Sequence, residues 1–276
     1  MNNGYSIQVD NISCDYYSDG NSHQQLNGNH CHDKYEITYI LSASGRYIVE
    51  GSEHKVTGGL LMLISPMSYH KVDLDEDTPI EIYTLQFSKS DLSESAAAVL
   101  DRITDNGKSC GVVYPKAQIS AELFGAFERL SVASQLDGSE ACVYMQAILA
   151  EIVVLLSSTN GEKMNYVGEE LGARVARYLN SNIERNISLD KLAHKFFVSK
   201  YHLCRAFKIY SGTSVHSYVN QKRIIHAKGL IESGLTAAGA AERVGFGDYS
   251  AFYRAYVKVV GKSPTSQQNK QLISKS

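Results

Sequence analysis

The pattern of apolar and polar positions changes near residue 118, from short strand-like runs to helical spacing. Between residues 30 and 90, runs rich in aromatic and β-branched residues alternate with turn signals, which is typical of β-strands. The strand-like runs are 35–41, 45–50, 55–57, 60–64 and 80–87, with a turn expected at 51–54. Many short strands separated by regular turns predict a sandwich or a barrel.

A helical hairpin is expected next. Ile119, Leu123, Phe127 and Leu130 fall on one stripe of a helix. A second helix is predicted from Ser139, as its N-cap, to about Leu156, with apolar residues almost all the way round. Such a helix must be covered on more than one side, by its own domain or by a partner subunit, and residues 143–156 are the best candidate for a homodimer contact. Its longest apolar run is interrupted by an acidic residue and falls short of the ~20 residues that span a bilayer, so no membrane segment is predicted.

From about residue 167 to 265 the pattern predicts short helices and contains a weak internal repeat. Arg205-Ala206 recurs as Arg254-Ala255, 49 residues later, and Gly212 and Ser214 recur as Gly261 and Ser263 at the same offset. Each copy reads as helix, tight turn and second helix, which is the arrangement of a helix-turn-helix. Gly245 suits the turn of the second copy because glycine tolerates the left-handed conformation, whereas the first copy has Phe197 there.

Charged residues are also distributed unevenly along the chain. The net charge is −2, but residues 171–276 hold 17 Lys and Arg against five acidic residues, a balance of +12, which leaves −14 for residues 1–170. Such an asymmetry indicates a basic module that binds a polyanion. The five cysteines are scattered and form no Cys-x-x-Cys pair, which favours a reducing, cytoplasmic setting.

Residues 167–267 resemble the DNA-binding domain of AraC-type transcription regulators. The matching segments include Ile187-Ser188-Leu189, Leu192-Ala193, Val244-Gly245-Phe246 and Gly261-Lys262-Ser263-Pro264. The resemblance implies two helix-turn-helix units joined by a central helix over about 214–233, reading adjacent major-groove segments. The DNA-contacting residues expected from their place in the two recognition helices are Lys200, Tyr201, Cys204, Arg205, Lys208, Tyr249, Ser250, Tyr253 and Arg254. Lys222 and Arg223 are assigned to phosphate contacts or to solvent.

The N-terminal half carries a second resemblance. His30-x-His32-x3-Glu36, followed by His70, is similar to the metal-ligand pattern of cupin barrels, and imidazoles with a carboxylate suit iron, manganese or zinc. The wider stretch, with Pro66 four residues before His70, resembles the cupin-like sensor domain of AraC-type regulators, which usually lacks a catalytic metal. The enzyme form of the motif also has a glycine two residues after the proline, where this chain has Ser68. We therefore expect no metal, no cofactor and no catalytic residue.

The sequence thus predicts a multidomain α+β protein: a cupin-like β-barrel with a helical hairpin over residues 1–160, and an all-α domain with two helix-turn-helix motifs over 165–276. The expected function is a cytoplasmic transcription regulator whose DNA binding or activation is controlled by a small molecule. The alternative is a metal-dependent cupin enzyme fused to a DNA-binding domain. Expected partners are double-stranded DNA, an effector for which a sugar or a cation is easier to accept than an anion, a second copy of the chain and RNA polymerase. The polar groups expected around the effector are His30, His32, Glu36, Tyr39, Arg46, His70 and Tyr83.

Overall fold

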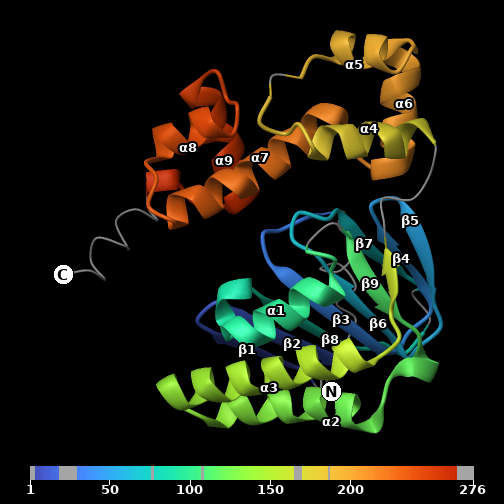
Figure 1. The fold of residues 1–276 in the computed structure, drawn as a ribbon, viewed down its shortest axis with the longest axis vertical. Helices are drawn as coiled ribbons and strands as arrows, with labels where there is room; N and C mark the ends of the chain where they lie inside the picture. Colours follow the sequence, from blue (N-terminus) through green and yellow to red (C-terminus); the bar gives the residue numbers. More distant parts are fainter. Residues whose placement is uncertain are drawn as a thin grey trace. The chain divides into compact units, whose positions relative to one another are not determined.

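The computed structural model describes residues 4–18, 30–75, 78–106, 109–164, 170–185 and 187–265. The chain divides into two compact units, one of residues 1–30 and 34–167 and the other of residues 31–33 and 168–276. The first unit contains β-strands and helices, and the second is helical (Figure 1).

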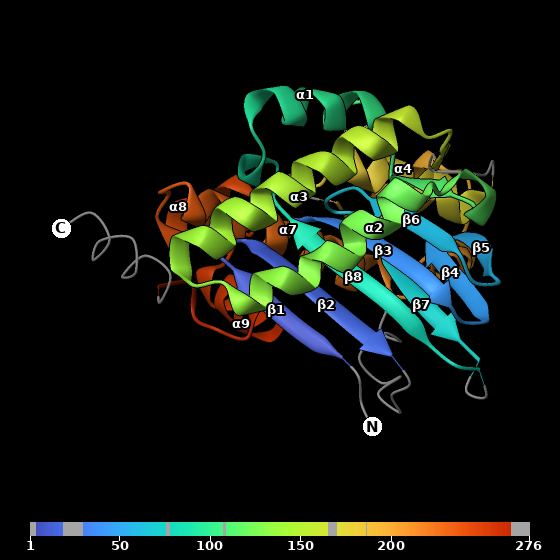
Figure 2. The same ribbon diagram turned by 90° about the horizontal axis from the view of Figure 1, so that it is seen from below.

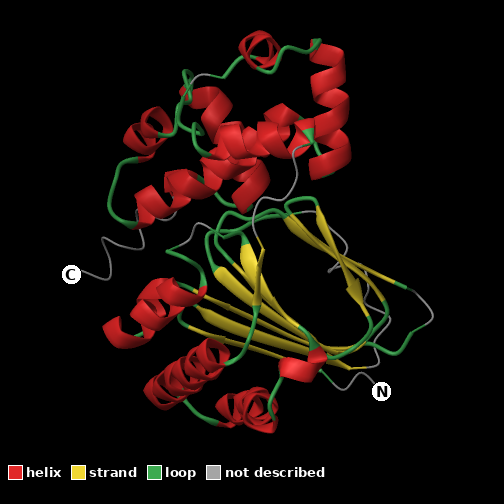
Figure 3. Cartoon of the chain, turned by 45° about the vertical axis from the view of Figure 1, so that its right-hand side comes forward, coloured by secondary structure: helices red, strands yellow, loops and turns green. Residues whose placement is uncertain are grey.

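The described strands of the first unit form two antiparallel sheets that face each other (Figure 3). The larger sheet has the strand order β1-β2-β8-β3-β6-β9-β10, and the smaller has the order β5-β4-β7. The strands are β1 (Tyr5–Val9), β2 (Ile12–Ser18), β3 (Tyr35–Ser42), β4 (Gly45–Val49), β5 (Ser52–Val56), β6 (Leu60–Ile64), β7 (His70–Leu74), β8 (Glu81–Phe87), β9 (Gly111–Tyr114) and β10 (Glu162–Met164). Strand β10 pairs with β9, so the sheet of the first unit extends past residue 160.

Strand β3 shows how the two faces of the larger sheet differ. Ile37 and Tyr39 belong to the core on the helical side, whereas Ile40 belongs to the core between the sheets. Because side chains alternate along a strand, Glu36 and Thr38 share the inner face with Ile40. The turn before β5 is at Glu50 and Gly51, both with positive φ (44° and 80°), rather than at 51–54 as the sequence suggested.

Three helices cover the outer face of the larger sheet: α1 (Glu94–Ile103), α2 (Ala121–Arg129) and α3 (Gly138–Ser158) (Figure 2). The α2–α3 pair confirms the predicted helical hairpin, although the N-cap of α3 is Asp137 and not Ser139. By length and composition α3 could cross a membrane, and it is the one described helix for which this holds. Six of its buried residues, however, pack into the core of its own unit: Met145, Ile148, Leu149, Ile152, Val153 and Leu156.

The second unit contains the two predicted helix-turn-helix motifs. Its described helices are α4 (Leu171–Asn180), α5 (Leu189–Lys195), α6 (Lys200–Ser211), α7 (Val215–Glu232), α8 (Ala237–Arg243) and α9 (Tyr249–Val260). Side-chain oxygens of Ser188, Ser199, Ser214, Thr236 and Asp248 cap the N-termini of α5, α6, α7, α8 and α9. The turns are left-handed at Phe197 (φ 56°) and Gly245 (φ 84°), as the repeat predicted.

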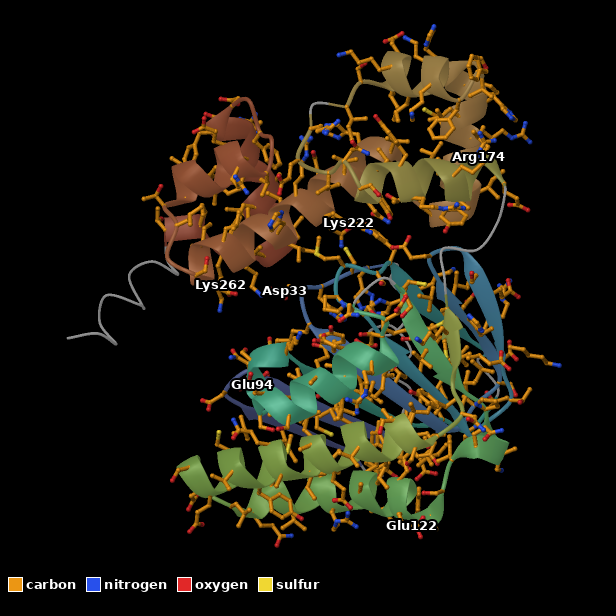
Figure 4. All side chains as sticks on the ribbon, in the orientation of Figure 1. Asp33, Glu94, Glu122, Arg174, Lys222 and Lys262 are labelled. Carbon is orange, nitrogen blue, oxygen red and sulfur yellow. The ribbon has the colours of Figure 1, made fainter. Side chains whose placement is uncertain are left out.

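Two basic residues of α7 are structural, and their assignment to phosphate or solvent was wrong. Lys222 (Figure 4) is 3% exposed and donates to Asn180 Oδ1 at 2.6 Å. Arg223 is 9% exposed and donates to three backbone carbonyls, those of Ile183, Arg185 and Gly245, at 2.8, 2.6 and 2.9 Å. Sequence alone could not separate them from surface cations, because α7 has apolar residues on several sides.

Candidate functional site

The second helix of the first helix-turn-helix, α6, has one buried and one exposed face. Leu203 and Phe207 are fully buried. On the opposite side Tyr201 is 77% exposed, and Arg205 and Lys208 are also exposed, at a spacing of four and seven residues that aligns them on one helix face. The core side fixes the helix, so the exposed side is free to meet a partner.

Helix α9 repeats this arrangement. Phe252 and Tyr256 are fully buried, and they occupy the positions of Leu203 and Phe207 in the repeat. The four residues predicted to contact DNA are all exposed: Tyr249, Ser250, Tyr253 and Arg254. The two recognition helices therefore expose the same positions of the repeat, and at one of these positions each has an arginine.

Two residues of α6 that were predicted to contact DNA are less accessible than the others. Lys200 forms an ion pair with Asp190 of α5 at 2.7 Å, with both side chains exposed. Cys204 is only partly exposed. Within the described residues, Arg205 and Arg254 have no ion-pair partner.

The second site is a polar cluster of three histidines and one glutamate, in which Glu36 and His70 are buried. One ligand atom from each of His30, His32, Glu36 and His70 can be chosen so that all four lie within 4.8 Å of one another. Glu36 comes from β3 and His70 from β7, while His30 is joined to His70 by two backbone hydrogen bonds of 3.1 and 2.9 Å. The structure thus brings together the four residues that the motif singled out.

The Glu36 carboxylate is held by hydrogen bonds from three side chains. Thr38 Oγ1 and Tyr47 Oη donate to Oε1 at 2.8 and 3.2 Å, and Gln86 Nε2 donates to Oε2 at 2.8 Å. The carboxylate and the Tyr47 side chain are buried. Sequence reasoning missed these three donors: Thr38 could have been found from the alternation of β3, but Tyr47 and Gln86 required the strand pairing.

His70 is oriented by its backbone. Its Nδ1 lies 2.9 Å from the carbonyl oxygen of Ser68, which can only accept, so Nδ1 carries the proton. Its Nε2 then faces Glu36 Oε1 at 3.5 Å. Burial disfavours the charged imidazolium, but the Glu36 carboxylate and the Ser68 carbonyl outweigh it and raise the pKa of His70.

Three residues expected around an effector do not face the interior between the sheets. Tyr39 and Tyr83 lie on the outer face of the larger sheet, where both rings contact Phe127 of α2. Arg46 is half exposed and pairs with Asp73 at 2.7 Å, and more distantly with Glu53. Placing these residues around an effector inside the barrel was wrong, because strand alternation and pairing turn them outward.

Two protein-family models match this chain. An AraC-like ligand binding domain matches residues 15–152, and a helix-turn-helix domain matches residues 192–270. The two matches lie on the two units that carry the buried cluster and the paired recognition helices. The chain is therefore a transcription regulator built from a ligand-binding domain and a helix-turn-helix DNA-binding domain, and it belongs to the AraC-type family.

Individual relatives are distant. The chain is 23% identical over 210 residues to the HTH-type transcriptional activator RhaS of Mannheimia succiniciproducens, covering 74% of this chain and 75% of the relative. It is 26% identical over 227 residues to the uncharacterized HTH-type transcriptional regulator YbfI of Bacillus subtilis, covering 80% of each. Among solved structures, ToxT from Vibrio cholerae is 13% identical with a TM-score of 0.40, covering 97% of this chain and 96% of that one.

Proposed function

We propose that the second unit binds specific DNA sequences through α6 and α9, and that a small molecule held by the first unit controls this binding. The observation that carries the proposal is the equivalence of the two exposed recognition faces. Arg205 and Arg254 occupy the same position in the repeat, in a segment of net charge +12. An isolated basic helix is common, whereas two matched ones suit adjacent major-groove segments of one duplex.

The side-chain chemistry of the exposed residues indicates which part of the DNA each would contact. Arginine is the usual bidentate reader of guanine, so we assign Arg205 and Arg254 to base edges. Tyr201, Cys204, Tyr249, Ser250 and Tyr253 are suited to looser base or phosphate contacts. Lys200 and Lys208 would meet phosphate, with Lys200 giving up its exposed pair with Asp190, a change that costs little at a solvated surface.

The test begins with selection of bound duplexes from a random pool by the full chain, followed by anisotropy titrations at several salt concentrations. Arg205→Ala and Arg254→Ala should each weaken binding by about 1–3 kcal/mol and relax preference at one base position. Arg102→Ala, which removes an exposed arginine from α1 of the first unit, is the matched control and should leave binding unchanged. Unchanged affinity and sequence preference in both recognition-helix variants would refute the assignment.

We also propose a homodimer formed through α3. Most of the apolar stretch 143–156 packs inside its own unit, but Val143 and Val154, 67% and 52% exposed, lie eleven residues apart on one side of the helix with Ala147 between them. Val154→Glu should shift sedimentation from dimer to monomer, whereas Val259→Glu on α9 should not. A wild-type monomer at micromolar concentration would contradict this.

The proposed mechanism is a change in population and not a reaction: effector binding in the first unit alters how available the second is for DNA. We assign the protein to the cytoplasm, where DNA and RNA polymerase, a further proposed partner, are present. The regulator function is favoured over the enzyme alternative because both matched domains and the characterised relative RhaS are regulatory.

A further inference from the structure

A pocket of about 260 Å³ lies on the outer face of the larger sheet, at its β9–β10 edge. It is bounded by these two strands and by the C-terminal ends of α1 and α3. The exposed side chains of Arg102, from α1, and Lys163, from β10, both line it. We propose that this pocket binds a small organic carboxylate with an apolar body, held by these two cations. The proposal does not rest on DNA binding.

Strand pairing sets which side chains face the pocket. Val112 and Tyr114 of β9 belong to the core on the helical side of the sheet, whereas Val113 and Met164 belong to the core between the sheets. Lys163 is paired with Val112, and paired residues of antiparallel strands lie on the same face. Lys163 therefore extends on the helical side. The pocket is thus separate from the space between the sheets, where an effector was expected.

The floor of the pocket is apolar and closely packed. Ile103, Val112 and Leu156 are buried and belong to one core cluster. Tyr114 is also buried, and its ring lies against Gly161, where an added Cβ would collide with Cε1 of the ring and lie 2.8 Å from Cζ. Such a floor favours a ligand with an apolar body, which leaves water when it binds. Pockets for drug-sized ligands measure about 300–1,000 Å³, so this pocket suits a smaller molecule.

The charges of the two cations are not balanced by the protein around them. In the part of the chain that the structure describes, neither Arg102 nor Lys163 forms an ion pair. None of the described residues that line the pocket is acidic. Two like charges at one pocket repel each other, and an anion between them turns that repulsion into attraction. The pocket therefore lacks only the negative partner.

The helix ends at the pocket do not need these cations as hydrogen-bond donors. Near the C-termini of α1 and α3, the hydroxyls of Thr104, Ser157 and Thr159 donate to backbone carbonyls at 3.0, 2.7 and 2.8 Å. The two helix dipoles still contribute roughly −0.5 charge each, about −1 together, against +2 from Arg102 and Lys163. The balance of about +1 matches a carboxylate better than a phosphate dianion.

The experiment titrates the full-length chain with octanoate by isothermal titration calorimetry at low ionic strength. Octanoate should bind saturably. Octanamide keeps the apolar chain but lacks the charge, and inorganic phosphate lacks the chain, so each should bind about tenfold more weakly or less. Arg102→Met and Lys163→Met each remove one cation and keep an apolar stem at an exposed position. Each should weaken octanoate binding about tenfold, because one charge-assisted hydrogen bond is lost.

The control is Lys55→Met, which makes the same charge change at an exposed position of β5 in the smaller sheet and should leave octanoate binding unchanged. Circular dichroism shows whether each variant has folded; if one of the two pocket variants fails to fold, the other decides the question. Three results would each overturn the proposal: no saturable binding of octanoate, equal binding of octanamide, or equal affinity in Lys163→Met and Lys55→Met.

The DNA-binding proposal is tested apart from this one. Its titrations contain no carboxylate ligand, so the pocket is unfilled there and Arg102→Ala remains a valid control for DNA binding. Loss of DNA binding in the Arg205 and Arg254 variants does not depend on octanoate, and octanoate binding does not depend on those arginines. Either proposal can therefore fail alone.

Discussion

Arg223 gives the sharpest test of how the second unit is held together. Its guanidinium, on the central helix α7, links the segment before α5 to the turn of the second helix-turn-helix through hydrogen bonds to the carbonyls of Ile183, Arg185 and Gly245. The Arg223→Met variant keeps much of the side-chain volume but removes all three donors. The carbonyls of Ile183, Arg185 and Gly245 then lose their hydrogen-bond donor. The link between the segment before α5 and the turn of the second helix-turn-helix is lost with it.

The magnitude follows from these contacts. A hydrogen bond from a charged donor contributes about 1.5–3 kcal/mol, so three contribute about 4.5–9 kcal/mol, from which the cost of burying the guanidinium, several kcal/mol, is subtracted. Arg223 is 9% exposed, so water can replace part of what is lost. We expect the free energy of unfolding to fall by about 2–4 kcal/mol, which moves a urea midpoint by about 1–2 M.

The assay is urea denaturation followed by circular dichroism, together with hydrogen exchange of peptides covering residues 183–185 and 244–246. Arg223→Lys keeps the charge but has a single ammonium for three carbonyls, so most of the loss should remain. Arg254→Met makes the same substitution at an exposed position and should change stability by less than about 0.5 kcal/mol. Equal midpoints and equal exchange for Arg223→Met and Arg254→Met would refute the reasoning.

The remaining predictions concern two glycine substitutions in helices and the pH dependence of stability. Gly229→Ala, inside α7, should raise the free energy of unfolding by about 0.5–1 kcal/mol, because the added Cβ meets no atom within 4 Å. Gly172→Ala in α4 should lower the free energy of unfolding, since the added Cβ would collide with Cβ of Tyr210 and would lie 2.8 Å from the carbonyl oxygen of Ala206. Thermal unfolding of both glycine variants tests this, and stability changes of the same sign in the two variants would contradict it. Burial lowers the pKa of His54, although Glu162 opposes the shift, so the folded state resists protonation. Wild-type stability should therefore fall more than that of His54→Gln as the pH drops from about 7.5 to about 5, and equal slopes in denaturation series would exclude this contribution.

Local patterns were sufficient for most of the second unit. Helical periodicity and turn residues act within a few turns of the chain, and the 49-residue repeat shows both twice, so the two helix-turn-helix motifs and the left-handed conformation at Phe197 could be predicted. The exposed faces of α6 and α9 followed from the resemblance to the AraC-type DNA-binding domain. The barrel was harder: β1, β2, β7, β9 and β10 were not predicted. All of them except β1, which pairs with the adjacent β2, pair with a strand distant in the sequence.

Side-chain direction in the barrel could not be obtained in the same way. The sequence placed Tyr39 and Tyr83 with Glu36 as candidate effector contacts, but a shift of one residue along a strand moves a side chain to the opposite face. Register between β3 and β8 puts both tyrosines against α2 and leaves Glu36 beside Gln86.

The sequence by itself determined the family, the division into an acidic and a basic part, and the four residues of the histidine–glutamate motif. Only the tertiary structure decided that these four converge, that Thr38, Tyr47 and Gln86 orient the carboxylate, and that Arg223 braces the second unit instead of contacting DNA. The physical reason is the range of the interactions. Helix periodicity, caps and charge balance are set by neighbours along the chain, whereas burial and hydrogen bonding at these sites are set by segments that meet only when the sheets and helices pack.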